Sequence, residues 1–243
     1  MYDPEVYWEE RLSKNFNLKG VGHQEFGKWY NYWLYKRKKT VLSQLLKKRF
    51  VVEKSVLDVG SGTGFFVNWY IRKGAKVSGI DISHTAVAKL RAEYPEARFE
   101  RVDFSSSDYQ PAQCYDIINI WDVVYHQVDD GAFVRLLENV DRALMEKGLF
   151  ICTDIFNCAL PFSPAPHVRF RNLEAYENIL LPKGYKLKKI CPLYNFLNRP
   201  FLHPGIPKAA YNLIAIPLFL ADYFQKEPSS INLSVVLWEK SGA

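Results

Sequence analysis

A cluster of three alternating glycines constrains this chain more than any other feature of its sequence. Residues 56–64 read Val-Leu-Asp-Val-Gly-Ser-Gly-Thr-Gly, so a short apolar run ends directly at the glycines. Glycine permits a tight turn and lets the backbone approach a ligand closely. A helix that begins at such a turn offers free backbone N–H groups to the polar groups of a ligand. We therefore predict a strand–turn–helix unit that forms part of a binding site.

Strand and helix signals alternate from residue 51 onward. Apolar, β-branched runs predict strands at 55–59, 76–80, 98–102, 116–120, 149–155, 185–191 and 231–238. Helical periodicity and end signals predict helices at 63–72, 83–93, 130–145 and 173–181. This alternation indicates an α/β fold, a three-layer Rossmann-like sandwich whose mostly parallel sheet is covered by helices on both faces. No regular crossover helix joins the last two strands.

The first 50 residues differ in character from the rest. They contain 11 basic and 5 acidic side chains, whereas the remaining residues contain 21 of each, so this segment carries the whole net charge of +6. We predict a helix over 27–50 whose apolar positions lie against the sheet, with its basic residues facing outward. Its basic residues could attract nucleic acid, anionic lipid or an anionic substrate, or could form a solvated face. Ten aromatic residues lie within its first 35 positions: Tyr2, Tyr7, Trp8, Phe16, Phe26, Trp29, Tyr30, Tyr32, Trp33 and Tyr35.

These contrasts suggest two regions. Residues 1–50 are expected to form an aromatic-rich helical cap or lid, because such a segment before the first strand suits a cover over a site. Residues 51–243 are expected to form the main domain. Within it, the proline-rich segment 192–230 reads as an insertion on the substrate side, with a helix at about 207–225.

Carboxylates follow two further predicted strands. Asp81 closes the second strand, 21 residues after Gly60. At that offset a carboxylate can accept hydrogen bonds from both ribose hydroxyls of an adenosine group, although it could also serve as a helix cap. Asp103 and Phe104 follow the third strand, where a carboxylate can accept from an adenine amino group and an apolar ring can stack on the base. The fourth strand delivers a polar cluster over 121–126, at the sheet edge where open α/β sheets bind ligands.

Together these motifs resemble the class I family of methyltransferases that use S-adenosylmethionine (SAM). The resemblance covers about residues 54–156 and implies a seven-stranded sheet whose last strand is antiparallel. It also implies SAM as the cofactor and S-adenosylhomocysteine (SAH) as the product. The family commonly has Pro-Gly-Gly before the fifth strand, whereas residues 145–148 here read Met-Glu-Lys-Gly. The resemblance places the cofactor at Asp58, Gly60, Ser61, Gly62, Gly64, Asp81, Ile82, Asp103, Phe104, Trp121 and Asp122.

His126 is the candidate catalytic base, since it follows the fourth strand on the face where the methyl group should point. It could equally be a structural histidine. Methyl transfer to a small-molecule hydroxyl is expected, because a base matters for a hydroxyl and much less for a neutral amine. Small-amine N-methylation and a non-catalytic SAM-binding module remain alternatives. Candidate substrate contacts are His23, Tyr30, Tyr125, Asp154 and Arg169.

Other classes fit less well. A dinucleotide-binding dehydrogenase would have Gly-x-Gly-x-x-Gly, but Phe65 occupies the position of its third glycine. Base-modifying amino-methyltransferases carry a proline pair after the fourth strand, which is lacking here, so nucleic acid is not expected as a partner. No metal site is predicted. None of the four cysteines forms a Cys-x-x-Cys pair, and the longest apolar run, 213–221, is too short to cross a bilayer, so we expect a cytoplasmic protein.

Overall fold

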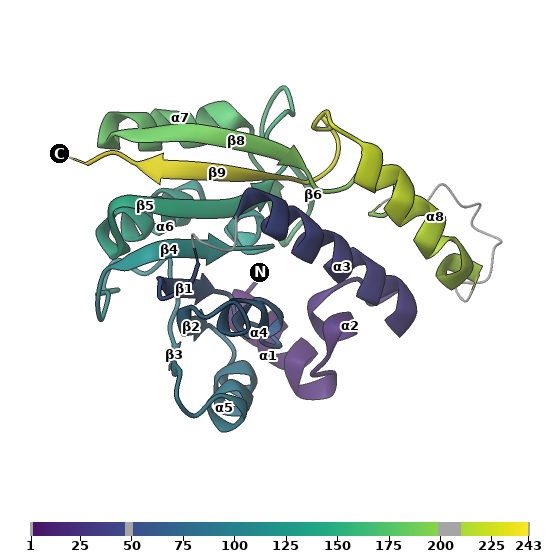
Figure 1. The fold of residues 1–243 in the computed structure, drawn as a ribbon, viewed down its shortest axis with the longest axis horizontal. Coiled ribbons are helices and arrows are strands. Elements are labelled where there is room, and N and C mark those ends of the chain that lie inside the picture. Colours follow the sequence, from purple (N-terminus) through teal and green to yellow (C-terminus); the bar gives the residue numbers. More distant parts are fainter. Residues whose placement is uncertain (1, 47–50, 199–209, 243) are drawn as a thin grey trace.

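The computed structural model describes residues 2–46, 51–198 and 210–242. Its main sheet has the order β3-β2-β1-β4-β5-β9-β8, in which β9 is the one strand that runs opposite to the others (Figure 1). This confirms the predicted fold class. The strands are β1 (Ser55–Val59), β2 (Lys76–Asp81), β3 (Arg98–Arg101), β4 (Tyr115–Ile120), β5 (Leu144–Asp154), β8 (Tyr185–Pro192) and β9 (Ser234–Lys240).

Alternate residues of each strand pack on opposite faces of the sheet, because side chains in a strand alternate in direction. Val56 and Ile117 belong to the apolar cluster that includes α4 (Phe65–Ile71) and α5 (His84–Glu93). Leu57 and Ile118 belong to the cluster formed with α6 (Asp130–Ala143) and α7 (Leu173–Leu180). The sheet is therefore covered on both faces, as parallel sheets require.

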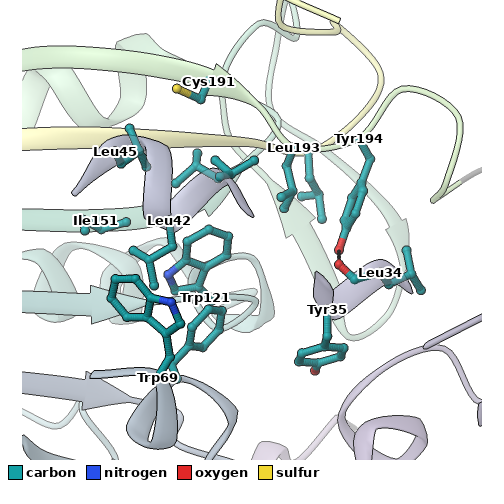
Figure 2. Packing of buried hydrophobic residues seen from close by; sticks show 14 of the residues in the cluster. Leu34, Tyr35, Leu42, Leu45, Trp69, Trp121, Ile151, Cys191, Leu193 and Tyr194 are labelled. Carbon is teal, nitrogen blue, oxygen red and sulfur yellow. Dashed lines mark hydrogen bonds between the residues drawn. The ribbon is translucent and has the colours of Figure 1, made fainter. Parts of the chain in front are cut away.

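The N-terminal segment forms α1 (Pro4–Lys14), α2 (Leu18–Val21) and α3 (Lys28–Leu45). Leu42 and Leu45 of α3 join Trp69, Trp121 and Ile151 in one apolar cluster (Figure 2). On its other side α3 lies beside α8 (Tyr211–Phe224), as Figure 1 shows. The part of the predicted helix over 47–50 and the start of the one predicted at 207–225 lie outside the described residues.

The prediction that the basic residues of α3 all face outward was wrong. Arg37 and Lys38 are only 2% and 4% exposed, whereas Lys39 is exposed. The physical reason is that α3 packs on both sides, against the sheet and against the chain after β8. The Arg37 guanidinium donates to the carbonyl oxygens of Pro192 and Leu193 at 2.9 and 3.0 Å.

Three smaller features complete the fold. A hairpin of β6 (Phe162–Ala165) and β7 (Val168–Phe170), which follows β5 in the chain, was not predicted. The single-turn helices η2 (Val124–His126) and η3 (Leu181–Lys183) follow β4 and α7. β5 starts at Leu144, five residues before the predicted position. In the described part of the chain, the helices are too short or too polar to span a bilayer.

Arg37→Met should lower the free energy of unfolding by about 2–4 kcal/mol, because two buried carbonyl groups would lose a charged donor. Lys39→Met, on the exposed side of the same helix, should change it by less than about 0.5 kcal/mol. Urea unfolding followed by circular dichroism measures both values. Equal stability of the two variants would contradict the anchoring role of Arg37.

Candidate functional site

A cavity of about 920 Å³, including its open mouth, lies at the carboxyl edge of β1, β2, β3 and β4. Helices α1, α2 and α3 cover it from the N-terminal segment. The cavity is lined by ten of the predicted site residues: Gly60, Ser61, Gly62, Asp81, Ile82, Asp103, Phe104, Trp121, Asp122 and His126.

The glycine turn forms the floor of the cavity. Gly60 has φ of +74°, and a Cβ there would lie 2.2 Å from a methyl group of Val123. A larger residue would therefore be strained and would clash. Next in the turn, the Thr63 hydroxyl is buried at the cavity without a hydrogen-bond partner among the described residues. Buried polar groups are normally paired, so this hydroxyl fits a polar ligand group.

Asp81 joins the turn to the end of β2. One carboxylate oxygen accepts from the Gly62 amide at 2.7 Å, and the other accepts from the Ser83 amide at 2.8 Å. Burial raises the pKa of Asp81, and these amides oppose that effect. A carboxylate has about four lone-pair sites. The two that remain can accept a pair of hydroxyl groups, as the ribose prediction requires.

Asp103 and Phe104 form the wall beyond Asp81. The Asp103 Oδ1 atom accepts from both the amide and the hydroxyl of Ser105, at 2.8 and 2.7 Å. The Phe104 ring is buried and meets Tyr109 edge-on, with ring centroids 4.8 Å apart. The second oxygen of Asp103 and one face of Phe104 thus remain available to a planar polar ring.

Trp121 is held from behind by a buried polar network. Its indole N–H donates to Asn119 Oδ1 at 2.6 Å, and Tyr70 donates to the same oxygen at 3.1 Å. The Asn119 amide nitrogen then donates to Asp58 at 2.6 Å. Burial raises the pKa of Asp58 to about 7. Asp58 therefore lies behind the cavity and positions Trp121, whose ring stacks on Phe66.

Lys38 of α3 forms a buried ion pair with Asp122 at the end of β4. Burial alone would raise the pKa of Asp122, but the Lys38 ammonium outweighs it and lowers that pKa. The ammonium also lies 4.0 Å from the centroid of Tyr35, and both side chains line the cavity. Sequence reasoning missed Lys38. The signal was available, because Lys38 shares the helical stripe of Leu34, Val41 and Leu45, which faces inward.

His126 lies at the mouth of the same cavity. Its Nδ1 atom lies 2.7 Å from the His167 carbonyl oxygen. Since a carbonyl can only accept, Nδ1 carries the proton and Nε2 keeps a lone pair. Burial lowers the pKa of His126 to about 4. At neutral pH the ring is therefore neutral, and the edge of Trp8 from α1 packs on it with centroids 5.1 Å apart.

Helix α1 is fastened over the cavity by Glu9. Its carboxylate accepts from the hydroxyls of Ser83 and Thr85, each at 2.6 Å, and from the Thr85 amide at 3.1 Å. Burial would raise the pKa of Glu9, but these donors outweigh it and lower the pKa to about 2. This contact places Pro4, Trp8 and Leu12 on the cavity. No motif in the sequence predicted this contact.

The structure does not bring the remaining predicted residues to the cavity lining. The Tyr30 hydroxyl is buried and donates to the Leu197 carbonyl, and His23 pairs with Asn198. Tyr125 is buried behind Asp122, to which its hydroxyl bonds. Gly64 caps α4.

Asp154 and Arg169 are occupied elsewhere. The Asp154 carboxylate is fully buried, where it accepts from the Tyr176 hydroxyl at 2.7 Å and from the Arg171 amide at 3.1 Å. Burial raises the pKa of Asp154 to about 7. Arg169 forms a two-bond ion pair with Asp130, with both distances 2.9 Å. Tyr30, Asp154 and Arg169, which were predicted to contact a substrate, thus each have a protein partner away from this cavity.

Comparison with known proteins finds relatives of part of the chain. Residues 56–148 match the family described as a methyltransferase domain. Ubiquinone biosynthesis O-methyltransferase from Yersinia pestis is 33% identical over 148 residues, which are 58% of this chain and 52% of that protein. The same enzyme from Rhodopseudomonas palustris is 35% identical over 81 residues, 32% of each chain. The chain thus spans about half or less of the length of the curated relatives it matches.

Solved structures share the fold at low sequence identity. Magnesium protoporphyrin IX methyltransferase from Synechocystis, crystallised with SAM, has a TM-score of 0.62 and 13% identity, with 99% of each chain covered. A SAM-dependent methyltransferase from Mesorhizobium loti has a TM-score of 0.58 and 20% identity, covering 84% of this chain and 98% of that one. The cyclase SpnF has a TM-score of 0.56 and 18% identity, covering 84% and 82%. Residues 56–148 thus match a methyltransferase domain, and the chain shares its fold with SAM-dependent methyltransferases of known structure.

Replacing Lys38 with Met should lower the free energy of unfolding by about 3–5 kcal/mol, because the Asp122 carboxylate would remain buried without its partner. The double variant Lys38→Met/Asp122→Asn should recover most of this loss, since no uncompensated charge remains. Denaturant unfolding of the wild type, both single variants and the double variant gives the coupling energy. Additive effects of the two substitutions would rule out a direct interaction.

Proposed function

We propose that this protein transfers a methyl group from SAM to a small-molecule acceptor, at a hydroxyl oxygen. The observation that carries the proposal is that one cavity combines the glycine turn, Asp81 and Asp103 with the unprotonated Nε2 atom of His126. The glycine turn, Asp81 and Asp103 suit a nucleoside, whereas the Nε2 atom suits an acceptor group that loses a proton.

The residues around the cavity fit the cofactor. Asp81 would accept from the ribose hydroxyls, and the free oxygen of Asp103 would accept from the adenine amino group. The unpaired Thr63 hydroxyl and the Lys38 ammonium are suited to the methionine carboxylate. When bound, SAM supplies a methyl group on a cationic sulfur. Trp121 and Tyr35 then present electron-rich faces that favour a nearby cation.

The chain's own part in the reaction is positioning and proton acceptance. In-line transfer requires the acceptor oxygen to be held about 3–3.5 Å from the methyl carbon, with water excluded. Trp8, Leu12 and Tyr35 close the cavity from the N-terminal segment, so we assign residues 1–50 the role of a lid. His126 Nε2 would accept the hydroxyl proton. With a pKa of about 4 it is a weak base, which favours an acidic hydroxyl such as a phenol or an enol over an aliphatic alcohol.

The two sequence relatives described above support oxygen as the methylated atom, since both are named O-methyltransferases. N-methylation of a small amine is the second candidate, and the low pKa of His126 favours it, because a neutral amine needs no base. A non-catalytic role is less well supported, because His126 lines the cavity without an Nε2 partner among the described residues. The shared fold of SpnF, a cyclase, still makes a direct turnover assay necessary.

Asp81→Ala should weaken SAH binding by about 1–3 kcal/mol, the scale for losing charge-assisted hydrogen bonds. Isothermal titration calorimetry measures the change, and thermal unfolding checks that the variant folds. Asp108→Ala, in an exposed position after β3, is the control and should bind SAH like the wild type. Unchanged affinity in a folded Asp81→Ala protein would remove the ribose assignment.

His126→Ala should lower kcat about 10²-fold, the low end for a general base because the ring is weakly basic, while the Kd for SAH stays within about twofold. Transfer of a labelled methyl group from SAM to a panel of phenols, carboxylic acids and amines supplies the assay. Because the pKa of His126 is about 4, kcat of the wild type should show no histidine inflection between pH 6 and 8. Wild-type turnover in His126→Ala would exclude it as the base.

A further inference from the structure

The outward surface of α8 is apolar along its whole length. Leu213, Leu220 and Phe224 are 81%, 49% and 74% exposed, and Ile216 and Tyr223 lie beside them, also exposed. Their spacing of three, four and seven residues puts them on one side of the helix. Monomeric soluble proteins rarely expose so continuous an apolar surface without a partner.

The opposite side of α8 fixes this orientation. Ala215 and Phe219 are buried, and the buried Asp222 carboxylate accepts from the amides of residues 195–197 at 2.8–3.1 Å. Rotating α8 to hide its apolar side would break these three hydrogen bonds and expose Phe219. The outward apolar side is therefore a consequence of tight packing on the inward side.

Helix α3 extends the same surface, and Figure 1 shows it running beside α8. Trp29 and Tyr32 are 48% and 44% exposed, and their rings stack with centroids 5.5 Å apart. Both touch Trp33, which packs on Phe219 of α8 at 5.0 Å. We call the exposed residues Trp29, Tyr32, Leu213, Ile216, Leu220, Tyr223 and Phe224 the α3–α8 surface.

Lysines border the α3–α8 surface. Lys28 is exposed at the start of α3 and Lys39 is exposed further along the helix, and the Lys36 ammonium lies 4.1 Å from the Trp33 ring centroid. Among residues 2–46, 51–198 and 210–242, no carboxylate lies within ion-pair distance of these three lysines. Helix α3 contains no acidic residue, and the single one in α8 is the buried Asp222. The border is therefore positively charged and uncompensated.

We propose that the α3–α8 surface docks on an anionic lipid bilayer, with both helices lying in the plane of the membrane. Apolar side chains, flanking tryptophan and tyrosine, and bordering lysines are the elements of interfacial binding. A helix of 14 residues is about 21 Å long, too short to span the hydrocarbon core, so it would lie on the membrane. The proposal stands independently of the methyl-transfer reaction.

A second copy of the chain fits this surface less well. A two-fold interface would use the same surface from both copies. Because α3 and the outward side of α8 offer no carboxylate, the lysines of one copy would meet no opposite charge on the other. An anionic membrane supplies both the apolar environment and the negative charge. The charge distribution of the α3–α8 surface therefore favours an anionic membrane over a second copy of the chain.

The test is co-sedimentation of the full chain with phosphatidylcholine vesicles, alone or mixed with equal parts of phosphatidylglycerol. We expect binding to the mixed vesicles that weakens as salt rises, and much weaker binding to phosphatidylcholine alone. Leu220→Glu/Phe224→Glu should reduce partitioning at least tenfold. Lys28→Gln/Lys39→Gln should reduce it about fivefold per lysine on the mixed vesicles only.

The control variant is Met145→Glu, an exposed apolar residue at the start of β5, at the amino edge of the sheet, which should bind vesicles like the wild type. Thermal unfolding confirms that each variant folds. Wild-type protein that stays in the supernatant with both vesicle types would overturn the proposal, as would unchanged binding of Leu220→Glu/Phe224→Glu. A concentration-dependent dimer in sedimentation velocity that this variant abolishes, without vesicle binding, would assign the surface to a second copy instead.

Discussion

The position of the N-terminal segment depends on the buried contact between Lys38 and Asp122. Both groups are removed from most of the solvent, and such a pair is retained only when each charge compensates the other. Asp122 itself has φ of +57°, and its amide donates to Thr153 at 2.8 Å, so the chain after β4 is held in one conformation. The pair joins that fixed point to α3. The position of the cavity roof thus depends on the charge of Lys38, which lies 84 residues before Asp122 in the chain.

The floor and the roof of the cavity are built in different ways. The floor consists of strand ends, whose side chains meet because the strands are parallel and in register, with Asp81 tying the glycine turn to β2. The roof has no such regular pairing: Glu9 ties α1 to the start of α5, whereas α3 is held by its buried apolar cluster together with Lys38 and Arg37. Helix α1, in which Leu12 is the buried residue, can therefore open locally at lower cost than the sheet can unfold. This difference suits a cover over a site that must admit and release ligands.

The sequence predicted the floor well because its signals are local. The glycines, Asp81 and Asp103–Phe104 each follow a strand directly, so recognising the strands was enough to place them on one sheet edge. Lys38 and Arg37 were missed because their charge suggested solvent, whereas Lys38 pairs with Asp122 and Arg37 with the chain at the end of β8, both distant in sequence. The partners of Asp154 could not be predicted for a related reason: it ends a strand at the carboxyl edge of the sheet, where Tyr176 and Arg171 donate to its carboxylate. A strand end gives the location of a carboxylate and leaves its partners undetermined.

The anchoring of α3 has a consequence for the order in which the protein can fold during synthesis. The Tyr194 hydroxyl donates to the Leu34 carbonyl (Figure 2), and Arg37 donates to Pro192 and Leu193, so α3 is held by residues that are made more than 150 positions later. Domains fold as units while the ribosome adds about 5–20 residues per second. Helix α3 can complete these contacts only after some 150 further residues have been made, which takes roughly 8–30 seconds at that rate.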